Sequence, residues 1–117
     1  MKISTIRDLL DAEVLCCEDA LDNDVFSACG SDMMSDVLMY VKDQAVLLTG
    51  LVNPQVIRTA EMMDMVCIVF VRSKRPNEAM IAMAEDDGIV MMASDMRMYE
   101  ACGTLYANGL IGTATHV

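Results

Sequence analysis

Two glycine-containing segments carry the polar side chains that are best suited to bind an anion. The first is Gly30-Ser31-Asp32, and the second runs from Thr49-Gly50 to Asn53. Glycine lets the backbone of a turn come close to a ligand, and the free N–H groups at a helix N-terminus attract negative charge. With two arginines that could supply positive charge, the candidate ligand-binding residues are Gly30, Ser31, Asp32, Thr49, Gly50, Asn53, Arg58 and Arg72.

The same residues also have an ordinary structural explanation. Gly50 would serve a tight turn, Asn53 would cap a helix and Arg72 would lie in solvent. The sequence lacks the glycine-rich signatures of nucleoside triphosphatases and of dinucleotide-binding enzymes. A binding site and a purely structural role for these turns therefore both remain open.

Catalytic arrangements are not recognisable in the sequence. The only histidine, His116, is the next-to-last residue, so a serine or cysteine nucleophile has no well-placed base. Adjacent carboxylates such as Asp86-Asp87 and Glu18-Asp19 fall at a predicted helix end and in a predicted loop. We therefore expect a protein without catalytic activity, and an enzyme with a shared active site is the alternative.

The five cysteines do not have the spacing of a metal site. No C-x-x-C pair occurs, and Cys29, Cys67 and Cys102 each fall in an apolar stretch. Cys16 and Cys17 are adjacent and could form a disulfide only through a strained ring, so we give their adjacency no functional meaning. We predict five reduced thiols, no metal site and no cofactor.

Composition and charge exclude several classes of partner. The formal net charge is −10, which argues against nucleic acid and against an anionic membrane surface. The longest apolar runs, such as residues 66–71, are far shorter than a membrane span, and the N-terminus lacks the features of a signal peptide. We expect a cytoplasmic protein.

The order of apolar segments predicts an α/β fold. Four continuous apolar runs of strand length cover residues 25–29, 45–49, 66–71 and 89–92. Continuous runs are typical of strands that helices cover on both faces, and the alternation with helices indicates parallel β-α-β units. We predict a mostly parallel central sheet flanked by helices. A short helix near residues 3–10, an edge strand at residues 13–16 and a turn at residues 21–24 are expected before it.

The helices between these strands have recognisable ends. Helical spacing over residues 33–41 follows Ser31, a suitable cap, and Asp32, which would favour the positive helix end. Asn53 precedes Pro54 at the start of a second helix, and a third runs from Asn77 to Gly88. A fourth begins near Ser94 or Asp95, ends at Gly109, and carries Tyr99, Cys102, Gly103 and Tyr106 on one face.

Thirteen methionines are many for a chain of 117 residues. Several come in pairs, Met33-Met34, Met62-Met63 and Met91-Met92, of which only one member would be expected to face a given core. The exposed members could form a flexible interaction surface, and a core that uses methionine in place of leucine is the alternative.

Three short motifs, within segments that span nearly the whole chain, carry a family resemblance. They are Gly30-Ser31-Asp32 with Met34-Ser35-Asp36, then Thr49-Gly50 with Asn53-Pro54-Gln55 and Arg58-Thr59-Ala60, and Met98-Tyr99-Glu100-Ala101-Cys102. These segments resemble stand-alone DRTGG-domain proteins, although the literal D-R-T-G-G string is absent. The resemblance implies a single domain over residues 1–112, similar to the N-terminal domain of HPr kinase/phosphorylase. Residues 113–117 would form a disordered tail.

The resemblance also implies a role in regulation. Related domains occur beside CBS domains in regulatory pyrophosphatases and at the N-terminus of some phosphotransacetylases. Small stand-alone members are associated with iron hydrogenase systems of anaerobes. Our leading hypothesis is a homodimeric, non-catalytic module that senses a small anionic metabolite or nucleotide. The second hypothesis is an accessory or scaffold protein that binds a redox enzyme and has no ligand.

Overall fold

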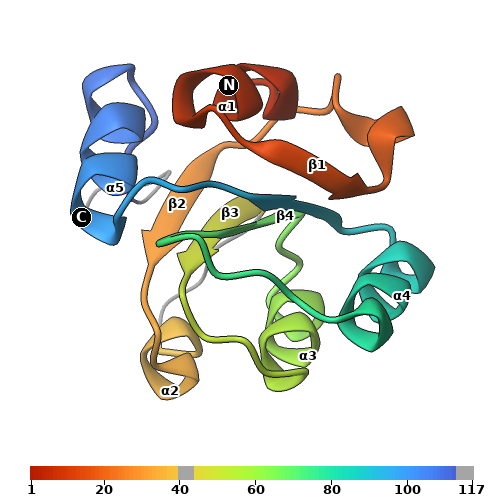
Figure 1. The fold of residues 1–117 in the computed structure, drawn as a ribbon. Coiled ribbons are helices and arrows are strands. Elements are labelled where there is room, and N and C mark those ends of the chain that lie inside the picture. The colour runs from red at the N-terminus through yellow and green to blue at the C-terminus, as the bar shows by residue number, and fades with distance from the viewer. Residues whose placement is uncertain (40–43, 113–117) are drawn as a thin grey trace.

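A five-stranded sheet forms the centre of the computed structural model, which describes residues 1–39 and 44–112 (Figure 1). The strand order is β1-β5-β4-β3-β2; the four strands from β2 to β5 run parallel, and β1 pairs antiparallel with β5 at one edge. The strands are β1 (Glu13–Cys16), β2 (Ser27–Gly30), β3 (Ala45–Thr49), β4 (Cys67–Phe70) and β5 (Val90–Ala93).

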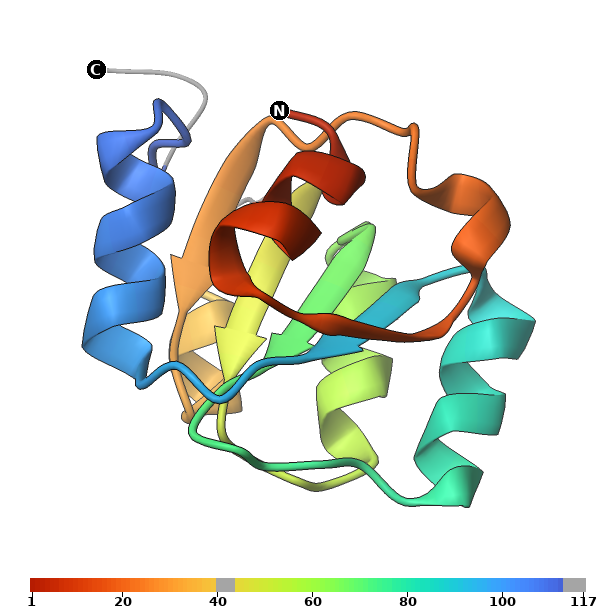
Figure 2. The same ribbon diagram turned by 45° about the horizontal axis from the view of Figure 1, so that its top comes forward.

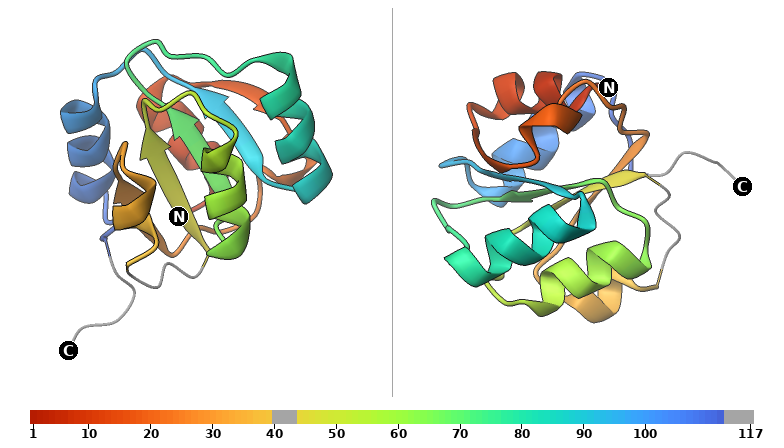
Figure 3. Two further views of the ribbon diagram at one scale, coloured as in Figure 1. Left: turned by 90° about the horizontal axis from the view of Figure 1, so that it is seen from below. Right: turned by 90° about the vertical axis from the view of Figure 1, so that its right-hand side faces the viewer.

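Helices cover both faces of this sheet, so the molecule has three layers. Helices α1 and α5 lie on one face, and α2, α3 and α4 lie on the other (Figures 1 and 3). A short 3-10 helix, η1, follows β1 directly. The bounds are α1 (Ile3–Leu10), η1 (Glu18–Ala20), α2 (Met34–Val37), α3 (Gln55–Met62), α4 (Glu78–Asp87) and α5 (Met98–Ala107).

Two hydrophobic cores lie on the two faces of the sheet because successive strand residues point in opposite directions. Along β3, Leu47 packs with the core under α2, α3 and α4, whereas Val46 and Leu48 pack with the core under α1 and α5. Each of the five β3 residues is buried. Burial on both faces explains why these segments are continuous apolar runs in the sequence.

The structure confirms the predicted mostly parallel sheet. The strand at residues 45–49 has the expected bounds, and the other three parallel strands are shifted or shortened by one or two residues. The expected edge strand at residues 13–16 is β1, and its antiparallel pairing with β5 contains a bulge between Val14 and Cys16. The tail at residues 113–117 and Val41, in a predicted helix, lie outside the described residues.

The ends of α4 and α3 follow the capping residues in the sequence. Asn77 caps α4 by accepting a hydrogen bond from the N–H of Met80 (2.9 Å), and Gly88 ends it with a φ of 71°. Helix α3 begins one residue later than expected. Pro54 is its N-cap, and the side chain of Asn53 still accepts the N–H of Gln55 at 2.8 Å.

Two helices differ from their predictions. Helix α2 contains only four described residues, and its N-cap is Met33, so neither Ser31 nor Asp32 occupies the predicted position at its start. Helix α5 begins at Met98, and the side that it buries carries Ala101 and Leu105. The predicted face with Tyr99 and Tyr106 is largely exposed, because the aromatic residues point away from the sheet.

The methionine pairs follow the expectation that only one member of a pair faces a given core. Met34 is buried and Met33 is 61 % exposed, as expected for neighbours on a surface helix. Met91 and Met92 are both fully buried, and each faces a different core, so this pair also meets the expectation. β5 is an interior strand, so Met91 enters one core and Met92 the other.

The outer edge of β2 receives a contact from the end of the described chain. The N–H of Ala28 donates to the carbonyl oxygen of Ile111 at 3.0 Å, beyond the last turn of α5. Figure 2 shows α5 beside β2, with the following segment returning toward the sheet. Among the described residues, none of the helices has the length and apolar character needed to cross a membrane.

Candidate functional site

The carboxyl ends of the four parallel strands meet along one edge of the sheet. The turns after β2, β3 and β4 contribute Asp32, Gly50 and Arg72, which are far apart in the sequence and in contact in the structure. In parallel α/β sheets, this edge is where ligands commonly bind. Asp32, Gly50 and Arg72 therefore have the location in the fold that the sequence predicts.

The carboxylate of Asp32 is the centre of these contacts. Its Oδ1 accepts the N–H of Gly50 at 2.7 Å and the hydroxyl of Thr49 at 3.2 Å. Its Oδ2 forms an ion pair with Nη2 of Arg72 at 3.1 Å. The N–H of Gly50 lowers the pKa of Asp32 below its usual value, and Arg72 and Thr49 act in the same direction.

Gly50 is required for the position of Arg72. A Cβ atom on Gly50 would lie 2.5 Å from Cζ of Arg72, so the guanidinium lies directly over the glycine backbone. Any larger residue at this position would displace the guanidinium and weaken its ion pair with Asp32. The sequence indicates Gly50 only as a turn residue, whereas the structure gives it this second role.

The backbone that carries Arg72 has an unusual conformation. Arg72 and Ser73 have φ angles of 61° and 59°, in the left-handed region that residues with side chains rarely adopt. The N–H of Arg72 donates to the carbonyl of Met96 at 2.7 Å, and that of Ser73 donates to Ser94 at 3.2 Å. The hydroxyl of Ser73 also donates to Asp95 at 2.9 Å. These hydrogen bonds therefore link the turns after β4 and β5, a contact that the sequence does not predict.

The remaining predicted residues lie around this centre or away from it. The N–H of Ser31 donates to the carbonyl of Leu48 at 3.0 Å, and its hydroxyl accepts the N–H of Met33 at 3.0 Å. Gly30 faces α5, where an added Cβ would lie 2.6 Å from Sγ of Cys102. Asn53 is exposed at the start of α3, and within residues 1–39 and 44–112 Arg58 forms no ion pair.

The arrangement resembles an anion site that a side chain of the protein already fills. A backbone N–H, a hydroxyl and a guanidinium surround Asp32, and such a set of donors also suits a phosphate oxygen. The ion pair is accessible, since the side chains of Asp32 and Arg72 are 39 % and 42 % exposed. A ligand anion could reach this position by competing with the Asp32 carboxylate.

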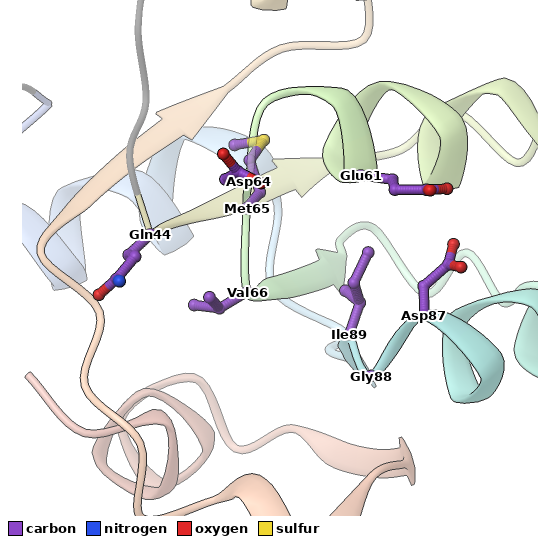
Figure 4. Close-up of a pocket in the computed structure, with 8 residues that line it drawn as sticks. All are labelled: Gln44, Glu61, Asp64, Met65, Val66, Asp87, Gly88 and Ile89. Carbon is purple, nitrogen blue, oxygen red and sulfur yellow. The ribbon is translucent and has the colours of Figure 1, made fainter.

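A pocket of the described residues lies at the opposite edge of the sheet. Figure 4 shows its lining, which includes acidic side chains from the ends of α3 and α4, and its volume is about 410 Å³. Asp87 raises the pKa of Glu61 by charge repulsion. None of the predicted ligand-binding residues lines it. Its lining consists of Gln44, Glu61, Asp64, Met65, Val66, Asp87, Gly88 and Ile89.

One group of side chains has the composition of a metal site. The thiols of Cys16 and Cys17 and the carboxylate of Glu85 each offer a ligand atom, and these atoms lie within 4.8 Å of one another. Burial is the main cause that raises the pKa of both thiols, to about 12 for Cys17. All five cysteines carry free thiols. The sequence alone does not reveal this group, because Glu85 is distant in sequence from the two cysteines.

Comparison with known proteins gives a structural match without a sequence match. The sequence matches no protein-family model and no curated protein. The structure is similar to the CBS and DRTGG domains of the regulatory region of Clostridium perfringens pyrophosphatase, which were solved with the activator diadenosine tetraphosphate. The TM-score is 0.73 at 14 % sequence identity, and the match covers 89 % of this chain and 45 % of that chain. The chain therefore has a DRTGG-like α/β fold, as the resemblance in its sequence implied.

Proposed function

We propose that this chain is a non-catalytic regulatory module that binds a small anionic ligand, either a nucleotide or a phosphorylated metabolite. The fold of the chain supports this proposal, because a regulatory region that was solved with a nucleotide activator has a similar fold. It is further supported by the donors that surround Asp32 at the carboxyl edge of the sheet.

The binding position is the one that the Asp32 carboxylate occupies. A phosphate oxygen would take the N–H of Gly50 and the guanidinium of Arg72, and Asp32 would turn toward solvent. The net charge of −10 opposes the approach of an anion, so local donors must outweigh the overall field. Asn53 and Arg58, on or before α3, are further candidate contacts for the rest of the ligand.

A thermal-shift titration tests this function. The probes are ATP, AMP, diadenosine tetraphosphate and a sugar phosphate, each at millimolar concentration. A ligand at a hundredfold excess over its Kd stabilises the fold by about 2.7 kcal/mol, which raises the Tm measurably. We expect Arg72→Gln to abolish the shift and Arg7→Gln, which changes a half-buried arginine on α1, to preserve it.

Two results would contradict the ligand-sensing function. One is that none of these anions raises the Tm of the wild-type protein. The other is that Arg72→Gln responds as the wild type does, which would place binding elsewhere. Asp32→Asn adds a check in the other direction, because removal of the competing carboxylate is expected to strengthen anion binding.

Dimerisation is a further part of the proposal, and an exposed apolar surface supports it. This surface is defined by exposed large apolar side chains that flank α2, follow β3 and end α3, each at least 41 % exposed. Its members are Met33, Leu38, Met39, Val52 and Met62. Light scattering is expected to give twice the chain mass of 12.8 kDa, and Met39→Glu with Met62→Glu is expected to halve it. A monomeric wild type would favour the second hypothesis, in which this surface binds a redox enzyme.

A further inference from the structure

Three potential metal ligands meet where β1, η1 and α4 come together. Cys16 is the last residue of β1, Cys17 is the N-cap of η1, and Glu85 lies in the last turns of α4. Figure 2 shows the end of β1 and the start of η1 next to the C-terminal end of α4. The contact joins segments that are 68 residues apart in the chain.

The backbone at Cys17 brings both thiols to the same side. Consecutive residues of a strand normally point to opposite faces of the sheet. Cys17 has a φ of 60° and a ψ of 42°, so the chain turns left-handed directly after Cys16. This conformation is costly for a residue with a side chain. Its consequence is that both sulfur atoms face the end of α4.

Glu85 is held in place by the same turn. The backbone N–H of Cys17 donates to Oε2 of Glu85 at 3.1 Å, and Sγ of Cys17 lies 3.7 Å from that oxygen. The thiol of Cys16 donates a hydrogen bond to the carbonyl oxygen of Ile89 at 3.3 Å, and this hydrogen bond ends when the thiol loses its proton. Backbone contacts therefore position the carboxylate and one of the two thiols.

The spacing fits a tetrahedral metal ion. Bonds of about 2.3 Å to sulfur and about 2.0 Å to oxygen place a sulfur and an oxygen ligand about 3.5 Å apart at the tetrahedral angle. The observed distance between Sγ of Cys17 and Oε2 of Glu85 is 3.7 Å. All three ligand atoms lie within 4.8 Å of one another, so small side-chain rotations would complete the set.

We propose that Cys16, Cys17 and Glu85 form a binding site for a thiophilic divalent cation such as Zn²⁺. Two thiolates and one carboxylate give a set of two sulfur atoms and one oxygen atom that zinc and cadmium accept. Both thiols release their protons to the solvent when the metal binds, and no electrons are transferred. Three protein ligands leave a fourth position for water or for an external donor.

Access and shielding at this group both suit metal binding. Cys16 is 6 % exposed, so one sulfur is protected from bulk solvent, whereas Glu85 is exposed and leaves an entry path. Within residues 1–39 and 44–112, no other set of three such ligands lies this close together. The group shares no residue with the proposed anion site at Asp32 and Arg72, so the two proposals can be tested separately.

Cadmium titration of the full, reduced chain provides the test. Cd²⁺ bound to thiolates absorbs in the ultraviolet, and the chain contains no tryptophan that would mask this band. We expect one Cd²⁺ per chain and displacement of the band by competing Zn²⁺. Cys17→Ser is expected to remove most of the absorption. Glu85→Gln is expected to weaken binding at least tenfold while the thiolate band remains.

Matched variants separate this site from the other cysteines and acids. A Cys29→Ser and Cys102→Ser double variant and Asp86→Asn, next to Glu85 on α4, are expected to bind Cd²⁺ as the wild type does. Circular dichroism verifies that Cys17→Ser and Glu85→Gln fold. The proposal is overturned if wild-type protein binds no Cd²⁺ at micromolar concentration, if the double variant loses the band, or if folded Glu85→Gln binds with unchanged affinity.

Discussion

Replacement of Asp32 by alanine is the sharpest test of how the carboxyl edge of the sheet is held together. The substitution removes the acceptor of the Gly50 N–H and the Thr49 hydroxyl, and it removes the partner of Arg72. Gly50 and Thr49 are buried, so their donors lose a partner where solvent has little access. The guanidinium of Arg72 is partly exposed and can turn toward water.

The structure sets the size of the expected effect. A hydrogen bond from a buried N–H to a carboxylate contributes about 1.5 to 3 kcal/mol, and the low end applies because Asp32 is partly exposed. Solvent screens the ion pair with Arg72, which adds less than about 1 kcal/mol. We expect Asp32→Ala to lower the free energy of unfolding by about 2 kcal/mol. Asp32→Asn, which keeps an acceptor oxygen, is expected to cost about half as much.

Urea unfolding at several pH values measures this effect and its electrostatic part. Because the pKa of Asp32 is lowered in the folded protein, its stabilisation is present above the unfolded pKa and is lost as pH falls through the folded pKa. The difference in free energy of unfolding between wild type and Asp32→Ala should therefore be largest at pH 7 and should decrease below about pH 4. Asp86→Asn, an exposed control on α4, should show no gap. Equal stability of Asp32→Ala and wild type at pH 7 would refute this reasoning, and so would a gap that persists unchanged into acid.

Three further substitutions test other parts of the structure. Gly50→Ala should displace Arg72 and cost about 1 kcal/mol, and it should add little when Asp32 is already alanine, which a double-mutant cycle measures. Asn77→Ala should lower the free energy of unfolding by about 1 kcal/mol, because the N–H of Met80 loses its cap, and chemical denaturation with Asp86→Asn as control detects this. Met92→Ala should cost about 3 kcal/mol because its side chain is fully buried, and a loss below 1 kcal/mol would mean that the core closes around the cavity.

The sequence predicts the sheet well because strands that are buried on both faces are continuous apolar runs in the sequence. β3 has the bounds of its apolar run, since all five of its side chains are inside. The ends of α4 are equally predictable, because the capping asparagine and the left-handed glycine contact only residues that are close to them in the sequence. Helix α5 is less readable. Tyr99 and Tyr106 count as apolar in any periodicity, yet they lie on its exposed side.

The contacts of the candidate sites were not predictable in the same way. The positions of Asp32, Gly50 and Arg72 at one edge follow from the order of strands and helices. The hydrogen bond from Gly50 to Asp32 and the ion pair with Arg72 depend on the directions of side chains in three different turns. Turns have no hydrophobic periodicity, so the sequence does not predict these directions. The approach of Glu85 to Cys17 depends on the left-handed backbone at Cys17, a conformation that cysteine itself does not favour.

The contact between Ile111 and β2 has a consequence for the behaviour of the protein in concentrated solution. An edge strand with free N–H groups is a template on which another chain can add a strand, and this is a common route to aggregation. The carbonyl of Ile111 occupies the N–H of Ala28 on that edge. Removal of the chain from Ile111 onward would expose the outer edge of β2. The truncated protein is then expected to aggregate before it unfolds.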